Sequence, residues 1–293
     1  MKAVIPVAGH GTRLEPHTLT QQKCLLPVAG KPVLEHILDR IVAAGITEVT
    51  LIIGHLGDQV IDFCSTYPAT QFTFVTQKEQ LGLGHAIHLG LEDTKEPVLI
   101  VLGDSILELD YLQFTLGPAS QLGVKSVPDP QRFGIVELEG DRVIRVVEKP
   151  EFPPSDLALI GIYYINNQLE LKLGIQQLID SDTRTKNEYQ LTDALQIMMD
   201  RGHVFNPFEI EACLDCGLPE TMLATNKILL KRAGESSIHT SATISDSNLV
   251  HSTISEDCTV NKASLENVIM LAGSKVSGKN LQNQIIGFQE EIS

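Results

Sequence analysis

The chain begins with a short apolar strand that ends in a glycine-rich turn. The residues from Lys2 to Val7 are mostly apolar, and Gly9 and Gly11 follow directly. Because glycine has no Cβ, backbone N–H groups in such a turn can approach an anion closely. Arg13, inside the turn, adds a planar cation suited to phosphate oxygens, and Lys23 follows ten residues later. The segment predicts a triphosphate-binding turn at a strand end, with an ordinary tight turn as the alternative.

Two better-known phosphate-binding motifs do not fit this segment. A dinucleotide-binding fingerprint requires a third glycine, and Leu14 occupies that position. A Walker P-loop requires a lysine directly after its last glycine, and Lys23 is too distant from Gly11 for that spacing.

The composition is that of an ordinary globular protein and excludes several functional classes. Of 293 residues, 43% are hydrophobic and 20% are charged, and no apolar run approaches the roughly 18 residues of a membrane span. A net charge of −15 argues against binding to nucleic acid or an anionic membrane. The N-terminus does not resemble a signal peptide, so we expect a cytoplasmic protein with reduced cysteines. We therefore interpret the C-x-x-C spacing of Cys213 and Cys216 as coincidental.

The N-terminal half alternates between strand-like and helix-like patterns. Four short apolar runs are typical of buried strands, at 3–7, 49–53, 72–75 and 98–102. Helical spacing runs from Val33 to Val42, between Pro32 and Gly45. We expect an α/β fold with a Rossmann-like, mostly parallel mixed sheet flanked by helices, and ligands at the carboxyl ends of its strands.

The middle of the chain predicts a hairpin over 134–138 and 142–147, followed by helices over 191–199 and 219–230. After residue 232 the composition changes to short Ser/Thr-rich segments with regularly spaced aliphatic residues. Those spaced by six are Ile238, Ile244 and Val250, and then Ile254 and Val260.

Six-residue spacing resembles the hexapeptide left-handed β-helix, although the register slips after Val250. We predict a catalytic domain over 1–232 and a short hexapeptide-repeat left-handed β-helix over 235–293, with a loose β-rich tail as the alternative. Such a tail would cap the catalytic domain or mediate self-association, and we expect a homo-oligomer.

Nine short motifs follow one another in a fixed order. They occupy 9–16, 23–32, 77–86, 102–104, 133–136, 148–150, 161–163, 188–193 and 214–217. In this order they resemble the sugar-1-phosphate nucleotidylyltransferases, over roughly residues 1–232. These enzymes join a nucleoside triphosphate to a sugar 1-phosphate and release pyrophosphate. A non-catalytic regulatory subunit of the same fold is the alternative, but such subunits typically lose a phosphate-binding cation or a metal carboxylate.

The resemblance implies three catalytic cations and a metal site. Arg13 would hold the β- and γ-phosphates, Lys23 would lie near the α-phosphate, and Lys149 would contact the phosphate of the sugar. Asp104 and Asp215 would bind Mg²⁺, which prefers carboxylate oxygens and completes its shell with phosphates and water. Each aspartate alone could equally be a turn or helix-cap residue.

The resemblance also implies a nucleotide site and a sugar site. The nucleotide site would comprise Ala8, Gly9, Gly11, Thr12, Arg13, Lys23, Gln77 and Gly82. The sugar site would comprise Gly134, Glu148, Lys149, Gly161 and Glu188. Glu148 would accept a hydrogen bond from a sugar hydroxyl, whereas Glu188 would either do the same or cap the helix that follows it.

The amide of Gln77 can both donate and accept, so it can read the imide edge of uracil or thymine. Residues 81–86 are closer to the UTP:glucose-1-phosphate type, whereas residues 215–220 and the tail are closer to the thymidylyltransferase type. We expect UTP and glucose 1-phosphate as substrates, with dTTP as the alternative nucleotide.

Overall fold

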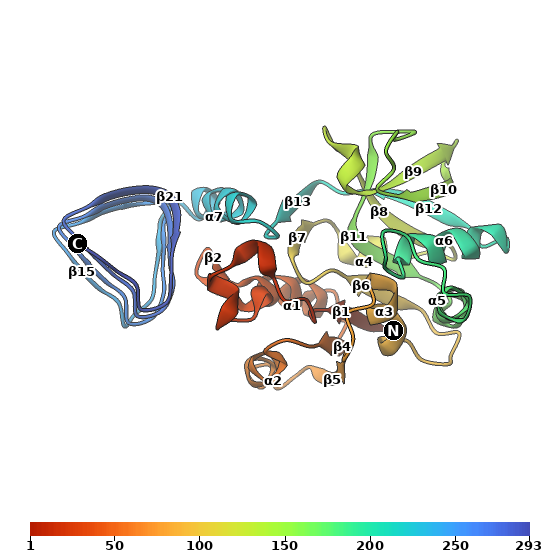
Figure 1. The fold of residues 1–293 in the computed structure, drawn as a ribbon, viewed down its shortest axis with the longest axis horizontal. Coiled ribbons are helices and arrows are strands. Elements are labelled where there is room, and N and C mark those ends of the chain that lie inside the picture. Colours follow the sequence, from red (N-terminus) through yellow and green to blue (C-terminus); the bar gives the residue numbers. More distant parts are fainter. The chain divides into compact units, whose positions relative to one another are not determined.

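The computed structural model describes residues 1–293 and divides into two compact units, each assembled from segments far apart in the sequence (Figure 1). The first unit contains Met1–Gly9, Asp39–Gly103 and Leu107–Cys213. The second contains His10–Leu38, Asp104–Ile106 and Leu214–Ser293. None of the helices combines the length and apolar character that crossing a membrane requires.

A nine-stranded mixed sheet forms the centre of the first unit, in the order β5-β4-β1-β6-β11-β8-β12-β10-β9. Its strands are β1 (Lys2–Pro6), β4 (Glu48–Ile53), β5 (Gln71–Thr76), β6 (Val98–Val101), β8 (Ser120–Ser126), β9 (Gly134–Glu139), β10 (Arg142–Glu148), β11 (Leu157–Ile165) and β12 (Phe205–Glu209). The predicted N-terminal strands and the predicted hairpin are confirmed.

The sheet is parallel in one half and mainly antiparallel in the other. β5, β4, β1 and β6 are parallel neighbours, as expected for strands joined by helical crossovers. β11 runs antiparallel to both of its main neighbours, β6 and β8, and β10 runs antiparallel to β9 and β12. The expected mixed α/β sheet with a parallel part is confirmed. In its later half most neighbours are antiparallel, and β12 is parallel to β8.

Six α-helices lie between residues 33 and 200. They are α1 (Val33–Ala43), α2 (Gly57–Cys64), α3 (Leu83–Gly90), α4 (Tyr111–Phe114), α5 (Gln168–Asp180) and α6 (Leu191–Asp200). In α1, Leu34, Ile37, Leu38 and Ile41 are fully buried, which confirms the face predicted from helical spacing. Leu191, Leu195 and Met198 of α6 belong to the core cluster that also contains strands of the sheet.

The N-terminal part of the second unit is a compact loop of three short 3₁₀ turns and a hairpin. The turns are Thr12–Leu14, His17–Leu19 and Lys23–Leu25, and the hairpin strands are β2 (Pro27–Val28) and β3 (Lys31–Pro32). The helix α7 (Pro219–Ala233) lies in the same unit. The strands β7 (Ser105–Glu108) and β13 (Ala212–Asp215) form a separate two-stranded sheet.

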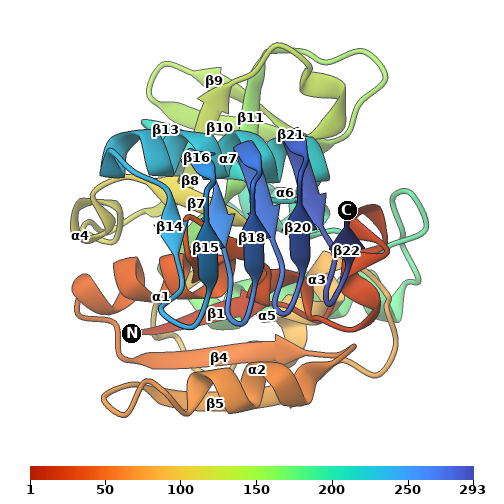
Figure 2. The ribbon, with the colours of Figure 1, turned by 90° about the vertical axis from the view of Figure 1, so that its left-hand side faces the viewer.

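The C-terminal segment winds in short parallel strands. They are β14 (Ser237–Ile238), β15 (Thr243–Ser245), β16 (Asn248–Val250), β17 (Thr253–Ile254), β18 (Thr259–Asn261), β19 (Ser264–Met270), β20 (Lys275–Ser277), β21 (Asn280–Ile286) and β22 (Glu291–Ile292). Seen end-on in Figure 1, these strands follow the three sides of a triangle, and Figure 2 shows successive turns stacked side by side. Each strand pairs in parallel with the strand one turn later, so Thr243 pairs with Thr259 and Thr259 with Lys275.

One turn of this segment contains 16 residues, the separation of the Ser245–Asn261 and Asn267–Asn283 side-chain hydrogen bonds. The inward positions therefore cannot all be spaced by six. The six-residue step from Ile254 to Val260 is confirmed, and both residues are buried. Elsewhere the spacing is shorter. Leu249, rather than the predicted Val250, packs against the core, and Ile238, on the first turn, is 47% exposed. The register slip in the sequence thus reflects a turn shorter than three hexapeptides.

A buried asparagine on α7 ties the hairpin that follows Lys23 to this C-terminal segment. The Asn226 Oδ1 atom accepts hydrogen bonds from the backbone N–H of Ala29, at 2.9 Å, and from the hydroxyl of Thr253, at 2.6 Å. Its amide nitrogen donates to the carbonyl of His251 at 3.2 Å. Because Asn226 is fully buried, these partners satisfy a polar group that would otherwise be costly to bury.

Candidate active site

The glycine-rich turn packs directly against the segment that carries Lys23. Gly11 has a φ of 70°, and a Cβ at this position would lie 2.9 Å from a methyl carbon of Thr18 and 3.1 Å from the Cβ of Lys23. The Thr18 hydroxyl donates to the Gly11 carbonyl at 2.9 Å. Glycine is required here both by the left-handed backbone and by this close approach, which brings the turn and Lys23 together as predicted.

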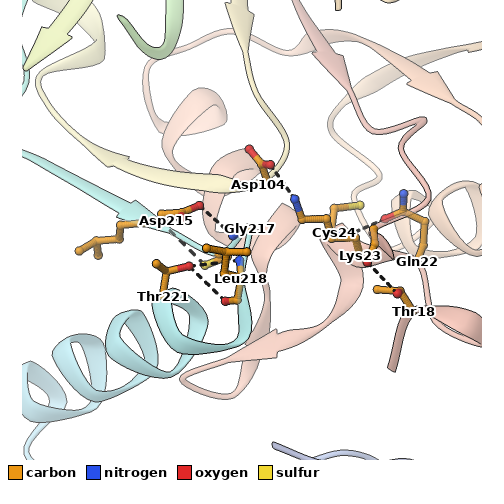
Figure 3. A network of polar contacts seen from close by, with 12 residues as sticks. Thr18, Gln22, Lys23, Cys24, Asp104, Asp215, Gly217, Leu218 and Thr221 are labelled. Carbon is orange, nitrogen blue, oxygen red and sulfur yellow. Dashed lines mark hydrogen bonds and ion pairs between the residues drawn. The ribbon is translucent and has the colours of Figure 1, made fainter. Parts of the chain in front are cut away.

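Lys23 forms an ion pair with Asp104, which comes from a distant part of the sequence (Figure 3). The Nζ atom of Lys23 lies 2.6 Å from Oδ2 of Asp104. The lysine side chain is only 14% exposed, whereas that of Asp104 is 34% exposed. Lys23 begins a 3₁₀ turn, where the side chain of Gln22 accepts a hydrogen bond from the backbone of Cys24 at 2.6 Å. The backbone at Lys23 is therefore fixed locally.

Asp215 lies next to this pair. The backbone N–H of Cys216 donates to the Asp104 carbonyl at 2.9 Å, and Oδ1 of Asp215 accepts from the Gly217 N–H at 2.8 Å. Burial raises the pKa of the Cys216 thiol, the charges of Asp215 and Asp104 raise it further, and Lys23 lowers it. All five cysteines are free in this structure, so Cys213 and Cys216 form no disulfide.

Asp104 and Asp215 fit the chemistry that Mg²⁺ prefers, since both supply hard carboxylate oxygens within one unit. No group of three or more His, Cys, Asp and Glu side chains in the chain could hold a metal ion alone. A magnesium ion held here would thus take most of its ligands from phosphates and water.

In the segment after β1, the main chain is accessible at Gly9, whereas the carbonyl of Ala8 already has a hydrogen-bond partner. A Cβ at Gly9 would meet no atom within 4 Å, so a ligand can approach its main chain freely. The Ala8 carbonyl instead accepts a hydrogen bond from the side-chain amide of Gln80 at 3.1 Å. The sequence motifs did not single out Gln80.

The amide of Gln77 is buried and held in one orientation. Its nitrogen lies 3.1 Å from Nδ1 of His85 and 3.4 Å from the carbonyl of Gly82. Burial lowers the pKa of His85, while Glu79 raises it, and a neutral imidazole can accept the amide proton at Nδ1. His85 therefore orients Gln77, a contact that spacing in the sequence did not indicate.

Gly82, which the resemblance places in the nucleotide site, has a packing reason to be glycine. Its φ is 112°, and a Cβ there would lie 2.7 Å from Cβ of Glu188 and 2.8 Å from the carbonyl of Tyr189. A Cβ at Gly84 would lie 2.7 Å from the same carbonyl. Both glycines admit the backbone that carries Glu188, so the predicted contact of Gly82 with the base stays a prediction.

The predicted sugar-site residues Gly134 and Glu148 lie together in the first unit. They are register partners on β9 and β10, and a Cβ at Gly134 would lie 3.2 Å from Oε2 of Glu148. Lys149, with a φ of 41°, places its Nζ atom 3.2 Å from Oε1 of Glu148. In contrast to the Lys23–Asp104 pair, the carboxylate is the more buried member here: the side chain of Glu148 is 9% exposed and that of Lys149 is 48% exposed.

The two remaining sugar-site candidates have structural contacts of their own. A Cβ at Gly161, whose φ is 84°, would lie 2.9 Å from the side chain of Leu102. Oε2 of Glu188 accepts from the side-chain amide of Gln190 at 3.1 Å. Gln190 is the N-cap residue of α6, and no side chain hydrogen-bonds at that cap. Glu188 thus holds the side chain of the cap residue, and its role toward a sugar stays a prediction.

The predicted residues thus form two groups. Lys23, Asp104, Asp215 and Gly11 lie in the second unit with Arg13 and Thr12, which are exposed in the turn. Ala8, Gly9, Gln77, Gly82 and all five sugar-site residues lie in the first unit. The joining of both groups in one cleft remains a prediction.

Residues 2–232 match the model of a family described as nucleotidyl transferase. The chain is 34% identical to the low-salt glycan biosynthesis nucleotidyltransferase Agl11 of Haloferax volcanii, over 84% of this chain and 70% of that protein. It is 28% identical to a glucose-1-phosphate thymidylyltransferase of Streptomyces griseus, over 100% of this chain and 94% of the relative. A bifunctional protein GlmU of Methanococcus vannielii is 34% identical over 79% of this chain, which spans 55% of that longer protein.

Solved structures show the same similarity. A UDP-glucose pyrophosphorylase complexed with UDP-glucose is 26% identical, with a TM-score of 0.66 over 79% of this chain and 98% of that one. A putative glucose-1-phosphate thymidylyltransferase from Bacillus anthracis is 25% identical, with a TM-score of 0.67 over 78% of this chain and 94% of that one. With the family match covering most of its length, this chain belongs to the nucleotidyl transferase family of enzymes.

Proposed function

We propose that this nucleotidyltransferase transfers the uridylyl group of UTP to glucose 1-phosphate, giving UDP-glucose and pyrophosphate, with Mg²⁺ as cofactor. The observation that carries the proposal is the ion pair between Lys23 and Asp104, 2.6 Å apart beside the glycine-rich turn and Asp215. A lysine and carboxylates beside an open turn are the groups that nucleotidyl transfer needs.

The chemistry requires positive charge and positioning rather than a general base. The sugar phosphate attacks the α-phosphorus in line, the bond to the β-phosphate oxygen breaks, and pyrophosphate leaves with the electron pair. The attacking phosphate is already ionised near neutral pH, since its second pKa is about 6. Catalysis then depends on cations placed where charge accumulates on the phosphate oxygens.

In the second unit, Lys23 stabilises the charge that develops on the α-phosphate. Arg13, exposed in the turn, binds the β- and γ-phosphates that leave as pyrophosphate. Asp104 and Asp215 would hold Mg²⁺, which would act as a Lewis acid and polarise phosphoryl oxygens. With Mg²⁺ bound, Asp104 would be a metal ligand, and the ammonium group of Lys23 would be available to the nucleotide.

In the first unit, Glu148 and Lys149 bind the sugar phosphate. Glu148 accepts a hydrogen bond from a sugar hydroxyl, and Lys149 contacts the phosphate. Gln77, oriented by His85, reads the imide edge of the base. That edge is shared by uracil and thymine, so dTTP is the second candidate, and full-length similarity to a thymidylyltransferase favours keeping it.

The C-terminal segment is the proposed left-handed β-helix, with turns of 16 residues instead of the 18 of three hexapeptides. Its proposed role is self-association of the enzyme in the cytoplasm. Light scattering of the full chain tests this role, and a monomer at micromolar concentration would contradict it.

The decisive experiment is a matrix of five nucleoside triphosphates against several sugar 1-phosphates with Mg²⁺, scored by pyrophosphate release. We expect UTP with glucose 1-phosphate to give the highest rate and dTTP the second highest. A preference for ATP or GTP would overturn the role of Gln77 in base selection. Release of no pyrophosphate from any pair would favour the regulatory-subunit alternative.

A further inference from the structure

Glu148 is fixed by the hydroxyl group of Thr192, a residue of the 188–193 motif to which the sequence assigned no role. The Oγ1 atom of Thr192, near the start of α6, donates a hydrogen bond to Oε2 of Glu148 at 2.7 Å. Thr192 is 5% exposed, and the side chain of Glu148 is 9% exposed. A short hydrogen bond to a carboxylate in so buried a position is strong, because little water competes for it.

The two oxygens of Glu148 have partners of different kinds. Oε2 is held by the buried hydroxyl of Thr192, whereas Oε1 lies 3.2 Å from the exposed ammonium group of Lys149. A side chain exposed to solvent can move to a new partner at little cost, and a buried β-branched residue cannot. When Lys149 turns to a substrate phosphate, Thr192 is the partner that continues to hold the carboxylate.

The surroundings leave the Thr192–Glu148 pair little freedom. A Cβ at Gly134 would lie 3.1 Å from Oγ1 of Thr192 and 3.2 Å from Oε2 of Glu148, so the glycine backbone covers the hydrogen bond. One helical turn after Thr192, the side-chain oxygen of Gln196 accepts a hydrogen bond from the backbone N–H of Val146 at 2.9 Å. Helix α6 is thereby attached to β10 at two points on one face.

We propose that Thr192 is a positioning residue that directs the Glu148 carboxylate toward one hydroxyl of the sugar, and so determines selectivity for the sugar 1-phosphate. This inference rests on the proposed function, in which Glu148 accepts a hydrogen bond from the sugar. Thr192 itself contacts Glu148 and not the reacting atoms.

The test compares Thr192→Val, which keeps the shape and removes the hydroxyl, with Thr192→Ser, which keeps the hydroxyl. For Thr192→Val we expect KM for glucose 1-phosphate to rise about tenfold, the effect of one hydrogen bond to a charged group, while KM for UTP stays within twofold. Thr192→Ser should restore most of the affinity. Equal thermal midpoints would show that both variants fold.

A series of monodeoxy glucose 1-phosphates sharpens the test. One of them lacks the hydroxyl from which Glu148 accepts its hydrogen bond. With that sugar, the Thr192→Val variant and the wild type should have the same KM. Gln196→Ala is the matched control, because it loosens α6 from β10 without touching Glu148, and it should affect all sugars equally.

Each outcome bears on a different claim. Wild-type kinetics in Thr192→Val, or an equal loss with every deoxy sugar, would overturn the positioning role while leaving the proposed function intact. A wild-type enzyme that releases no pyrophosphate with any substrate pair would overturn the proposed function and the role of Thr192 together.

Discussion

The two lysine–carboxylate pairs among the predicted site residues are built in opposite ways. In the pair of the second unit the cation is the buried member, since Lys23 is 14% exposed and Asp104 34%. In the pair of the first unit the anion is the buried member, since Glu148 is 9% exposed and Lys149 48%. The Lys23–Asp104 pair therefore fixes a positive charge, whereas the Lys149–Glu148 pair fixes a hydrogen-bond acceptor.

This difference bears on which group of each pair is held in place. A buried side chain keeps its place because packing limits its rotamers, whereas its exposed partner can exchange for a ligand at low cost. In the proposed function, the fixed Lys23 would bind a phosphate group and Asp104 would bind the metal ion. The fixed Glu148 would accept a hydrogen bond from a sugar hydroxyl, and Lys149 would contact the phosphate of the sugar.

The largest expected effect is on turnover in Lys23→Met. Loss of the fixed cation should lower kcat by about 10²–10³, as for other preorganised electrostatic groups, with little change in either KM. Steady-state assays of pyrophosphate release measure kcat and both KM values. Lys275→Met is the control, because Lys275 forms an exposed ion pair with Glu291 in the same unit. Turnover in Lys23→Met equal to that of the control would remove the distinction between the two pairs.

Lys149→Met should have a smaller effect of a different kind. Because this lysine is half exposed, its contact with the phosphate is screened by water, and we expect KM for the sugar 1-phosphate to rise about tenfold with a lesser change in kcat. Steady-state kinetics at low and high salt measure the change. The exposed Lys95, also in the first unit, gives the control Lys95→Met. A fall in kcat as large as that of Lys23→Met would contradict the comparison.

Asp104→Asn should destabilise the fold by leaving Lys23 without its charged partner. The lysine is mostly buried, so we expect the free energy of unfolding to fall by about 1 kcal/mol, between the values of surface and buried pairs. Urea denaturation measures it. The double variant Lys23→Met with Asp104→Asn should recover most of this loss, because no unpaired charge remains; simple additivity would show that the pair is not coupled.

The smallest effect concerns Asp193, the residue after Thr192. Burial raises the pKa of Asp193, the negative charge of Glu148 raises it further, and a hydrogen bond with Thr185 lowers it. Because the pKa in the folded state lies above the ordinary value of 3.8, the ionised carboxylate costs stability at neutral pH. Relative to Asp193→Asn, the wild type should therefore gain stability as the pH falls from 7 toward 4. Parallel urea curves for the two proteins test the sign.

The order of strands and helices could be predicted from the sequence because hydrophobic periodicity is local. The helical spacing from Val33 to Val42 and the apolar run at 98–102 correspond to α1 and β6. The pairing direction of the later strands could not be predicted from local patterns, because it depends on how β9 and β10 join the sheet. The 16-residue turn was also missed, because only some inward positions, such as Ile254 and Val260, keep six-residue spacing.

The glycine-rich turn, the order of the motifs and the residue types of the site were determined by the sequence alone, because these features are written in short stretches of neighbouring residues. Tertiary structure alone decided which charges are buried and which side chains hold them. Lys23 and Asp104 are separated by 81 positions, and Glu148 and Thr192 by 44. Burial and hydrogen bonding at such separations arise from packing of the folded chain, and no local pattern encodes them.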